Sequence, residues 1–157
     1  MTELNSYIGQ YLITVNFGIG EISNIVEIDD GQFFKVTFPQ SNNINYFSIN
    51  NSSTYRHLSD KTEILKAIET FKKKHQDTEF NSTQEKINFY KSTFKAQDIQ
   101  TIAKHLSILN QEEEIHTSIL KIFEKTLDSF VLEIQFVLGI KNEEAWELIG
   151  LSQEKIK

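Results

Sequence analysis

Four histidines are the residues of this chain best suited to metal binding or acid–base chemistry. They are His57, His75, His105 and His116, and no two of them have the spacing H-x-x-x-H or H-E-x-x-H. Such spacings place two imidazoles on one face of a helix, where both reach a single zinc ion. The chain has no cysteine, which excludes a thiolate nucleophile, a disulfide framework and a cysteine-ligated zinc site. We therefore expect no metal site and no cofactor.

The serines, glycines and acidic residues also lack the spacing of a known catalytic motif. No serine lies in a G-x-S-x-G sequence, so the turn that exposes a catalytic hydroxyl is not predicted. Gly18-Ile19-Gly20 resembles the start of a phosphate-binding loop, but Ser23 occupies the third glycine position and strands follow. The acidic run Glu112–Glu114 is interpreted as charge that favours a helix N-terminus. The sequence predicts a protein that is not an enzyme and has no small-molecule substrate.

Lysines and aromatic residues are mixed in one predicted helix. Lys86, Lys91 and Lys95 recur there, with Phe89 and Tyr90 between them. Lysines neutralise phosphates and aromatic rings stack on bases, so this pattern indicates nucleic-acid binding. The same pattern is equally typical of a solvated lysine face above an aromatic core face. The residues alone leave both interpretations open.

Charge is distributed unevenly along the 157 residues, whose net charge is −6. Residues 1–58 have a net charge of −3, residues 59–110 of +2 and residues 111–157 of −5. Arg56 is the single arginine of the sequence, and arginine is the usual bidentate ligand of guanine and phosphate. A stand-alone DNA-binding protein is therefore not expected.

The apolar segments indicate where the protein resides. The chain does not start with a basic segment followed by an apolar run, and the most apolar stretch, 118–139, contains five charged residues. Neither a secretory signal nor a membrane span is predicted. We expect a cytoplasmic protein that does not bind membranes.

The first 58 residues have the pattern of short strands. Apolar runs at 11–17, 21–28, 32–38 and 44–49 are separated by Gly18–Gly20, by Asp29-Asp30-Gly31 and by Pro39–Asn43. An Asp-Gly pair between two apolar runs is a strong hairpin signal, because the turn needs positive φ. The residues Phe34, Val36 and Phe38 alternate, as in a strand with one buried face. So few strands bury little as a flat sheet, and a small curled barrel is therefore predicted.

After Ser59 the apolar residues recur at helical spacing. Asp60-x-x-Glu63 and Ser82-x-x-Glu85 are helix-capping signals, and Gly139 is a predicted C-cap. Trp146, in the last predicted helix, is expected to be a packing residue.

The predicted fold class is therefore α+β in two parts. A small SH3/Tudor-like antiparallel β-barrel occupies residues 1–58. An all-α bundle of about five helices occupies residues 59–157, with a polar, linker-like stretch at 75–83.

This order of elements, together with several sequence segments, resembles the CarD-like transcription regulators of bacteria. Tyr7–Ile22 is similar to the family's first strand and the turn after it, with Phe17 in place of a histidine. Tyr55–Ser59 is similar to the segment that closes the barrel. Lys95–Leu109 and Glu113–Leu138 are similar to the family's later helices.

The resemblance implies a protein partner for the barrel. In the family, the barrel binds the β subunit of RNA polymerase by adding a strand edge to it, which is β-augmentation. The corresponding surface lies on the second and last strands, where the candidate partner-binding residues are Ile25, Glu27, Ile28, Tyr46 and Phe47.

The resemblance also implies promoter DNA as a further partner. In the family, the helical domain contacts the melted promoter, and a tryptophan wedges into the minor groove. That tryptophan aligns near Thr83, or with Phe80 or Phe89 if the register shifts. The candidate nucleic-acid-binding residues are Lys86, Phe89, Lys91 and Lys95.

The expected function is thus that of a CarD-like regulator that binds RNA polymerase, with weak or diverged promoter contact. The alternative is a protein-binding adaptor with the same fold and no DNA binding.

Overall fold

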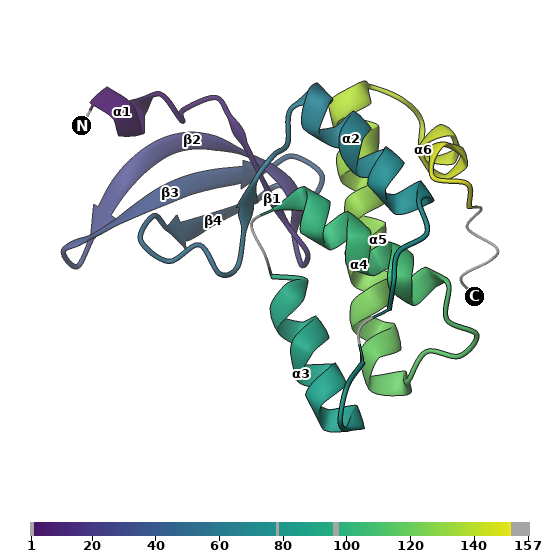
Figure 1. Cartoon of the computed structure of the whole chain (residues 1–157). Coiled ribbons are helices and arrows are strands. Elements are labelled where there is room, and N and C mark those ends of the chain that lie inside the picture. The colour runs from purple at the N-terminus through teal and green to yellow at the C-terminus, as the bar shows by residue number, and fades with distance from the viewer. Residues whose placement is uncertain (1, 78, 96–97, 152–157) are drawn as a thin grey trace. The chain divides into compact units, whose positions relative to one another are not determined.

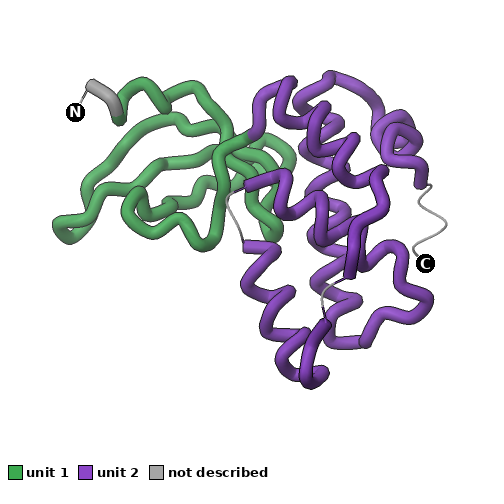
Figure 2. Tube along the Cα trace, viewed as in Figure 1, with its two compact units in different colours: residues 1–58 green, residues 59–157 purple. Residues whose placement is uncertain are grey.

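The chain forms a five-stranded antiparallel sheet followed by five helices, an α+β arrangement (Figure 1). The computed structural model describes residues 2–77, 79–95 and 98–151, which fall into two compact units, residues 1–58 and residues 59–157 (Figure 2). The first unit contains α1 (Thr2–Asn5), β1 (Tyr11–Thr14), β2 (Gly18–Ile28), β3 (Gly31–Phe38), β4 (Asn43–Ser48) and β5 (Arg56–His57). The second unit contains α2 (Lys61–Lys72), α3 (Thr83–Thr93), α4 (Ile99–Asn110), α5 (Thr117–Leu138) and α6 (Asn142–Leu148). Within the described residues, no helix combines the length and apolar character that a membrane span needs.

The sheet has the strand order β4-β3-β2-β1-β5, so β4 and β5 are its end strands. Strand β2 is long enough to pair with β3 over Glu21–Ile28 and with β1 over Gly18–Glu21. The register between β2 and β3 shifts between Ile22 and Asn24. Such a bulge increases the local twist and bends the strand. The described sheet is open, because the pairings of its strands include none between β4 and β5.

The hairpin predicted at Asp29-Asp30-Gly31 is confirmed, but its turn is formed by Asp29 and Asp30, and Gly31 already belongs to β3. These two residues connect β2 to β3 with φ values of 47° and 67°. Both angles lie in the left-handed region that a two-residue turn between twisted strands requires. The alternation predicted for β3 is confirmed as well, because Phe34, Val36 and Phe38 are each at most 1% exposed.

The predicted turn at Gly18–Gly20 is wrong, because these residues begin β2 and pair with β1. The turn lies earlier, at 15–17, and Thr14 organises it. The Thr14 hydroxyl accepts a hydrogen bond from the Phe17 amide at 2.8 Å and donates one to the Gly18 carbonyl at 3.2 Å. Gly20 has a packing role instead, since a Cβ there would lie 2.5 Å from Cγ1 of Val36 and 2.7 Å from the Phe38 ring.

The core of the first unit is mainly aromatic. Its rings form a continuous series of edge-on or tilted contacts in which Tyr55 contacts Phe34 and Phe47, and Phe47 contacts Phe38. Leu12, Ile22 and Val36 complete the core without any exposed surface. Ring pairs with this geometry gain attraction beyond that of their buried area. The aromatic series therefore fixes β3, β4 and the segment before β5 to one another.

Helices α2 and α3 begin, and helix α5 ends, where the capping signals of Asp60, Ser82 and Gly139 predicted. Asp60 and Glu63 form a reciprocal capping box at the start of α2. The Ser82 hydroxyl accepts a hydrogen bond from the Glu85 amide at the start of α3, and α5 ends at Gly139 with φ 66°. These bonds satisfy amides that a helix N-terminus otherwise leaves unpaired.

The core of the second unit is apolar and continuous across its five helices. Helix α5 contacts α2, α3, α4 and α6, and α2 packs along α4. Trp146 is 3% exposed, which confirms its predicted packing role. The other buried core residues include Ile64, Phe71, Tyr90, Leu106, Leu109, Ile119, Phe123, Leu127, Phe130 and Ile134. In the stretch predicted as a linker, the described residues before Thr83 form no helix or strand, Thr83 begins α3, and Phe80 packs against this core.

The substitution Gly20→Ala should destabilise the first unit by about 1–3 kcal/mol, the usual result of adding a methyl group to a filled core. The new Cβ overlaps Val36 and Phe38, which have no free space to move into because both are fully buried. The measurement is urea unfolding followed by the amide NMR signals of β1 to β4. The exposed Gln40→Ala, in the turn between β3 and β4, serves as control. An unfolding free energy within about 0.5 kcal/mol of wild type, the usual range of a surface substitution, would contradict this packing role of Gly20.

Candidate functional site

Strand β4 has one free edge. Strands β3 and β4 pair in the register Phe34↔Phe47 and Val36↔Asn45, and the Ile49 amide donates to the Gln32 carbonyl at 3.0 Å. Hydrogen-bonded pairs alternate with non-bonded pairs in an antiparallel ladder. Residues 43, 45 and 47 therefore direct their backbone groups towards β3, whereas residues 44, 46 and 48 direct theirs away from the sheet.

One end of this edge is already occupied by Tyr55. Its hydroxyl donates a hydrogen bond to the outward-facing Ser48 carbonyl at 2.8 Å. Tyr55 is 5% exposed. Burial raises the pKa of its hydroxyl above the ordinary value, and electrostatic interaction with the nearby Tyr7 raises it further. The backbone groups of Ile44 and Tyr46 have no hydrogen-bond partner among the described residues. The free edge therefore consists of Ile44 and Tyr46.

The side chains beside this edge form an exposed apolar face. Cross-strand partners share a face of the sheet, and Tyr46 and Ser48 stand opposite Lys35 and Phe33. This face is opposite to the one that carries the buried Phe34 and Phe47. We call it the outer face, and its apolar members are Val26, Ile28, Phe33, Ile44 and Tyr46. Ile28 is 40% exposed, Tyr46 is 48% exposed and Ile44 is 51% exposed.

The sequence-predicted partner-binding residues are divided between the two faces. Ile28 and Tyr46 lie on the outer face, whereas Ile25, Glu27 and Phe47 lie on the face of Phe34. Phe47 is a core residue, 7% exposed, and Ile25 is half-buried against the same core.

Strand β2 is less suited than β4 to pair with an added strand. The Ile25 amide donates to the Asn24 side-chain oxygen at 2.9 Å, and the bulge between Ile22 and Asn24 interrupts the ladder. Bulges of this kind protect a sheet edge from pairing. The two predicted strands are therefore not equivalent, because the amides and carbonyls of Ile44 and Tyr46 on β4 have no partner in the described part of the chain, whereas the Ile25 amide on β2 already has one.

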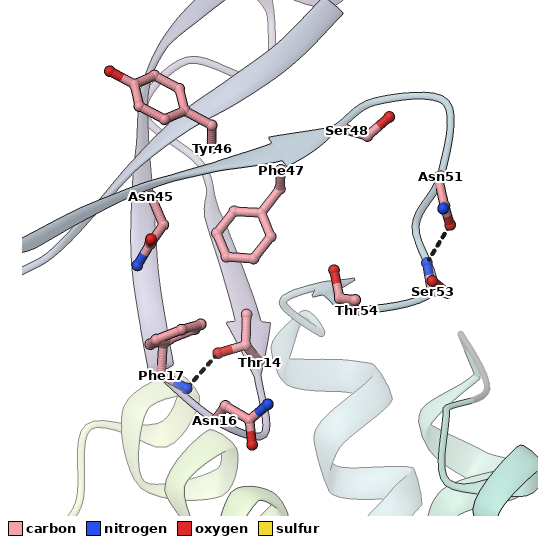
Figure 3. Close-up of a pocket in the computed structure, with 10 residues that line it drawn as sticks. All are labelled: Thr14, Asn16, Phe17, Asn45, Tyr46, Phe47, Ser48, Asn51, Ser53 and Thr54. Atoms are coloured by element: carbon pink, nitrogen blue, oxygen red, sulfur yellow. Dashed lines mark hydrogen bonds between the residues drawn. The ribbon is translucent and has the colours of Figure 1, made fainter.

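A pocket of about 340 Å³ opens on the other face of β4 (Figure 3). We call it the β4 pocket, and its lining residues are Thr14, Asn16, Phe17, Asn45, Tyr46, Phe47, Ser48, Asn51, Ser53 and Thr54. Figure 3 shows the Phe47 ring pointing from β4 into this space towards Phe17 and Thr14, while the Tyr46 ring points away on the opposite side of the strand. The pocket combines two aromatic rings with hydroxyl and carboxamide groups.

Ile44 and the polar lining of the β4 pocket were not among the sequence-predicted site residues. A signal for them was present, because the sequence has no charged residue between Lys35 and Arg56. A segment of this length without charge is unusual in a chain of which 24% is charged. Depletion of charge is characteristic of the centre of protein interfaces.

The sequence-predicted nucleic-acid-binding residues differ in exposure and in their partners. Lys86 is engaged by Glu112, whose two carboxylate oxygens each accept a hydrogen bond from its ammonium group at 3.0 Å. The side chains of this ion pair are 26% and 16% exposed. Lys91 is exposed near the end of α3, and Lys95 is exposed beyond that end, which is at Thr93. The prediction that Lys95 belongs to this helix is therefore wrong.

The interpretation of Glu112–Glu114 as charge at a helix N-terminus is also wrong. Helix α5 begins after its N-cap His116, and no acidic residue lies in its first turn. Glu112 instead forms the ion pair with Lys86, which joins α3 to the segment between α4 and α5.

Phe89 belongs to an aromatic cluster of the second unit. Its ring lies 5.1 Å from each of the rings of Phe80, Tyr90 and His105. The Tyr90 hydroxyl and Nδ1 of His105 are buried and have no hydrogen-bond partner in the described structure. Burial raises the pKa of Tyr90, and so do the negative charges of Asp77 and Glu112. Phe89 is therefore half-buried in a packed cluster and is not a free stacking platform.

His105 is the buried titratable group with the clearest consequence for stability. Burial lowers its pKa, and the charges of Lys104 and His75 lower it further, against a smaller opposite effect of Asp77.

In the described part of the chain, no three His, Asp or Glu side chains lie close enough together to hold a metal ion.

Comparison of the chain with known protein families and with curated protein sequences finds no match.

The substitution His105→Gln should reduce the acid sensitivity of the second unit. The unfolded chain takes up a proton on this histidine near pH 6.5, whereas folded His105 stays neutral to lower pH. The unfolding free energy should therefore fall as the pH decreases from 7 through 6.5, and less steeply in the variant. Urea unfolding followed by the fluorescence of Trp146, the single tryptophan, measures this difference. Equal pH slopes for wild type and His105→Gln would contradict the assignment.

Proposed function

We propose that the protein is a CarD-like transcription regulator that binds the β subunit of RNA polymerase by strand addition at β4. The observation that carries the proposal is the free edge, where the backbone groups of Ile44 and Tyr46 point outward without a partner. An extended segment of another protein satisfies these groups with main-chain hydrogen bonds. The choice of RNA polymerase rests on the resemblance of Tyr7–Ile22 and Tyr55–Ser59 to the family.

Several features support an interaction at this edge. Ile44 and Tyr46 expose about half of their side chains on the outer face, next to Lys35 and Phe33. An added strand would continue this face and cover part of their apolar surface. No proline, bulge or charged side chain lies on β4, although these are the usual means by which an edge strand avoids pairing.

We infer that the first unit is a variant of the SH3/Tudor-like barrel. The long, bulged β2 pairs with both β1 and β3, as a curled sheet requires. The β4 pocket lies between β4 and the turn at Asn16 and Phe17, where such a barrel would close. The proposed role is non-enzymatic, needs no cofactor and places the protein with RNA polymerase in the cytoplasm.

The helical unit supports only a weak contact with promoter DNA. Lys91 and Lys95 are exposed and free to approach phosphate, but Lys86 is held by Glu112 and Phe89 is packed against Tyr90. These two observations favour the second candidate function, a protein-binding adaptor that uses the same β4 edge and does not bind DNA.

The substitution Tyr46→Pro should weaken binding to the isolated β-subunit lobe by at least about tenfold, a loss that corresponds to about 1.4 kcal/mol. Proline removes the outward-facing amide of Tyr46 but none of the hydrogen bonds to β3, so the sheet should persist. The matched control Tyr46→Thr removes the ring but keeps the amide and should bind more tightly than Tyr46→Pro. The measurement is biolayer interferometry with the full chain. Failure of the wild type to bind at tens of micromolar, or equal binding by Tyr46→Pro, would falsify the proposal.

Fluorescence anisotropy with forked promoter DNA at two salt concentrations distinguishes the two candidate functions. A promoter role predicts salt-dependent affinity that decreases when Lys91→Glu and Lys95→Glu are combined, because phosphate contacts release counterions. Lys86→Glu should have no larger effect than Glu112→Gln, because this lysine is already paired. Absence of binding at both salt concentrations would leave the adaptor as the function.

A further inference from the structure

We propose that the β4 pocket receives one tyrosine-like side chain from the strand that pairs with β4. This inference rests on the proposed function, since it names the residue by which β4 selects its partner strand. It assigns a purpose to a cavity that the sheet itself does not need, and it predicts a sequence preference for the partner.

The register of strand addition determines which side chain reaches the pocket. An added strand bonds to the backbone of Ile44 and Tyr46, so the residue opposite Tyr46 places its side chain on the outer face. Successive side chains of a strand alternate between faces. The residues opposite Asn45 and Phe47 therefore share the face of the pocket, which is lined by both of these residues. An incoming strand consequently directs a side chain into the pocket from a residue opposite Asn45 or Phe47.

The lining of the pocket favours an aromatic ring with a polar end. Phe47 and the half-exposed Phe17 offer two ring faces or edges within one space (Figure 3). Asn16, Asn45 and Ser53 border the same space, and no hydrogen bond of their side chains is found within the described structure. Carboxamide and hydroxyl groups both donate and accept hydrogen bonds, so they match a phenolic hydroxyl. A volume of about 340 Å³ lies at the lower end of ligand pockets, which suits a single side chain.

The absence of charge excludes other long side chains. No lysine, arginine, aspartate or glutamate lines the pocket, and none occurs in the sequence between Lys35 and Arg56. A carboxylate or ammonium group that entered would lose water without gaining an ionic partner, which is costly. The preferred residue is therefore aromatic and uncharged.

Synthetic strands test this preference without reference to any natural partner. The probes are three capped heptapeptides of alternating threonine and valine that differ only at the central residue, which is tyrosine, alanine or glutamate. They are titrated into the full chain, and amide NMR shifts report binding at Phe17, Asn45 and Phe47. The tyrosine peptide should bind at least fivefold more tightly than the alanine peptide, and the glutamate peptide no more tightly than the alanine peptide.

Two tryptophan variants show whether the preference comes from the pocket. Ser53→Trp places a ring in the pocket from an exposed position, and should abolish the preference for tyrosine. Ser41→Trp makes the same change on the exposed turn before β4, outside the pocket, and should keep the preference. Equal affinities of the three peptides, no shifts at these amides, or an unchanged preference in Ser53→Trp would overturn the inference. If the amide NMR signals shift with protein concentration and not with peptide concentration, the edge pairs with a second copy of this chain, and the inference is also overturned.

The polymerase experiment separates this inference from the function on which it rests. If Ser53→Trp binds the β-subunit lobe as tightly as the wild type, the pocket does not select the partner strand and the inference fails alone. If the lobe does not bind but the tyrosine peptide is preferred, the polymerase proposal fails and the pocket assignment stands.

Discussion

Strand β4 carries hydrogen-bonding groups on both of its edges, but only one edge has a neighbouring strand. The aromatic contacts among Phe34, Phe47 and Tyr55 hold β4 against β3, and the Tyr55 hydroxyl satisfies the Ser48 carbonyl at one end of the outer edge. The backbone of Ile44 and Tyr46 remains for another chain. The exposed outer face and the stretch without charged residues include both of these residues, and Tyr46 also lines the β4 pocket. An interaction surface at β4 explains the four features together.

In the second unit, Phe89 and Lys86 are engaged in contacts within the unit. Its apolar core includes side chains from all five helices, and Phe89 lies in a cluster with Phe80, Tyr90 and His105. The ion pair of Lys86 and Glu112 removes one lysine from the basic residues of α3. Both results favour the solvated lysine face above an aromatic core face, the second of the two interpretations that the sequence left open. The DNA contact of the proposed function therefore depends on Lys91 and Lys95 alone among the predicted residues.

Local chemistry made much of the fold predictable, and contacts between distant residues account for most of the errors. The turn at Asp29-Asp30, the caps at Asp60 and Ser82 and the end of α5 at Gly139 depend on neighbouring residues, and all were predicted. Gly20 was misassigned to a turn because its requirement comes from Val36 and Phe38 on another strand. Glu112 was misassigned because its partner Lys86 is 26 residues away. The free edge of β4 depends on strand order, which neither periodicity nor turn residues specify, so Ile44 and the pocket required the structure.

Hydrogen–deuterium exchange of single amides, with and without the β-subunit lobe, tests the central claim most directly. In the free protein, the amides of Asn45 and Phe47 should exchange slowly because they bond to β3, and those of Ile44 and Tyr46 should exchange quickly. We predict that binding of the lobe slows the exchange of the Ile44 and Tyr46 amides by at least about tenfold, since each new main-chain hydrogen bond must open before exchange. The exchange of the Asn45 and Phe47 amides should remain slow. A bound lobe that leaves Ile44 and Tyr46 as fast as in the free protein would contradict strand addition at β4.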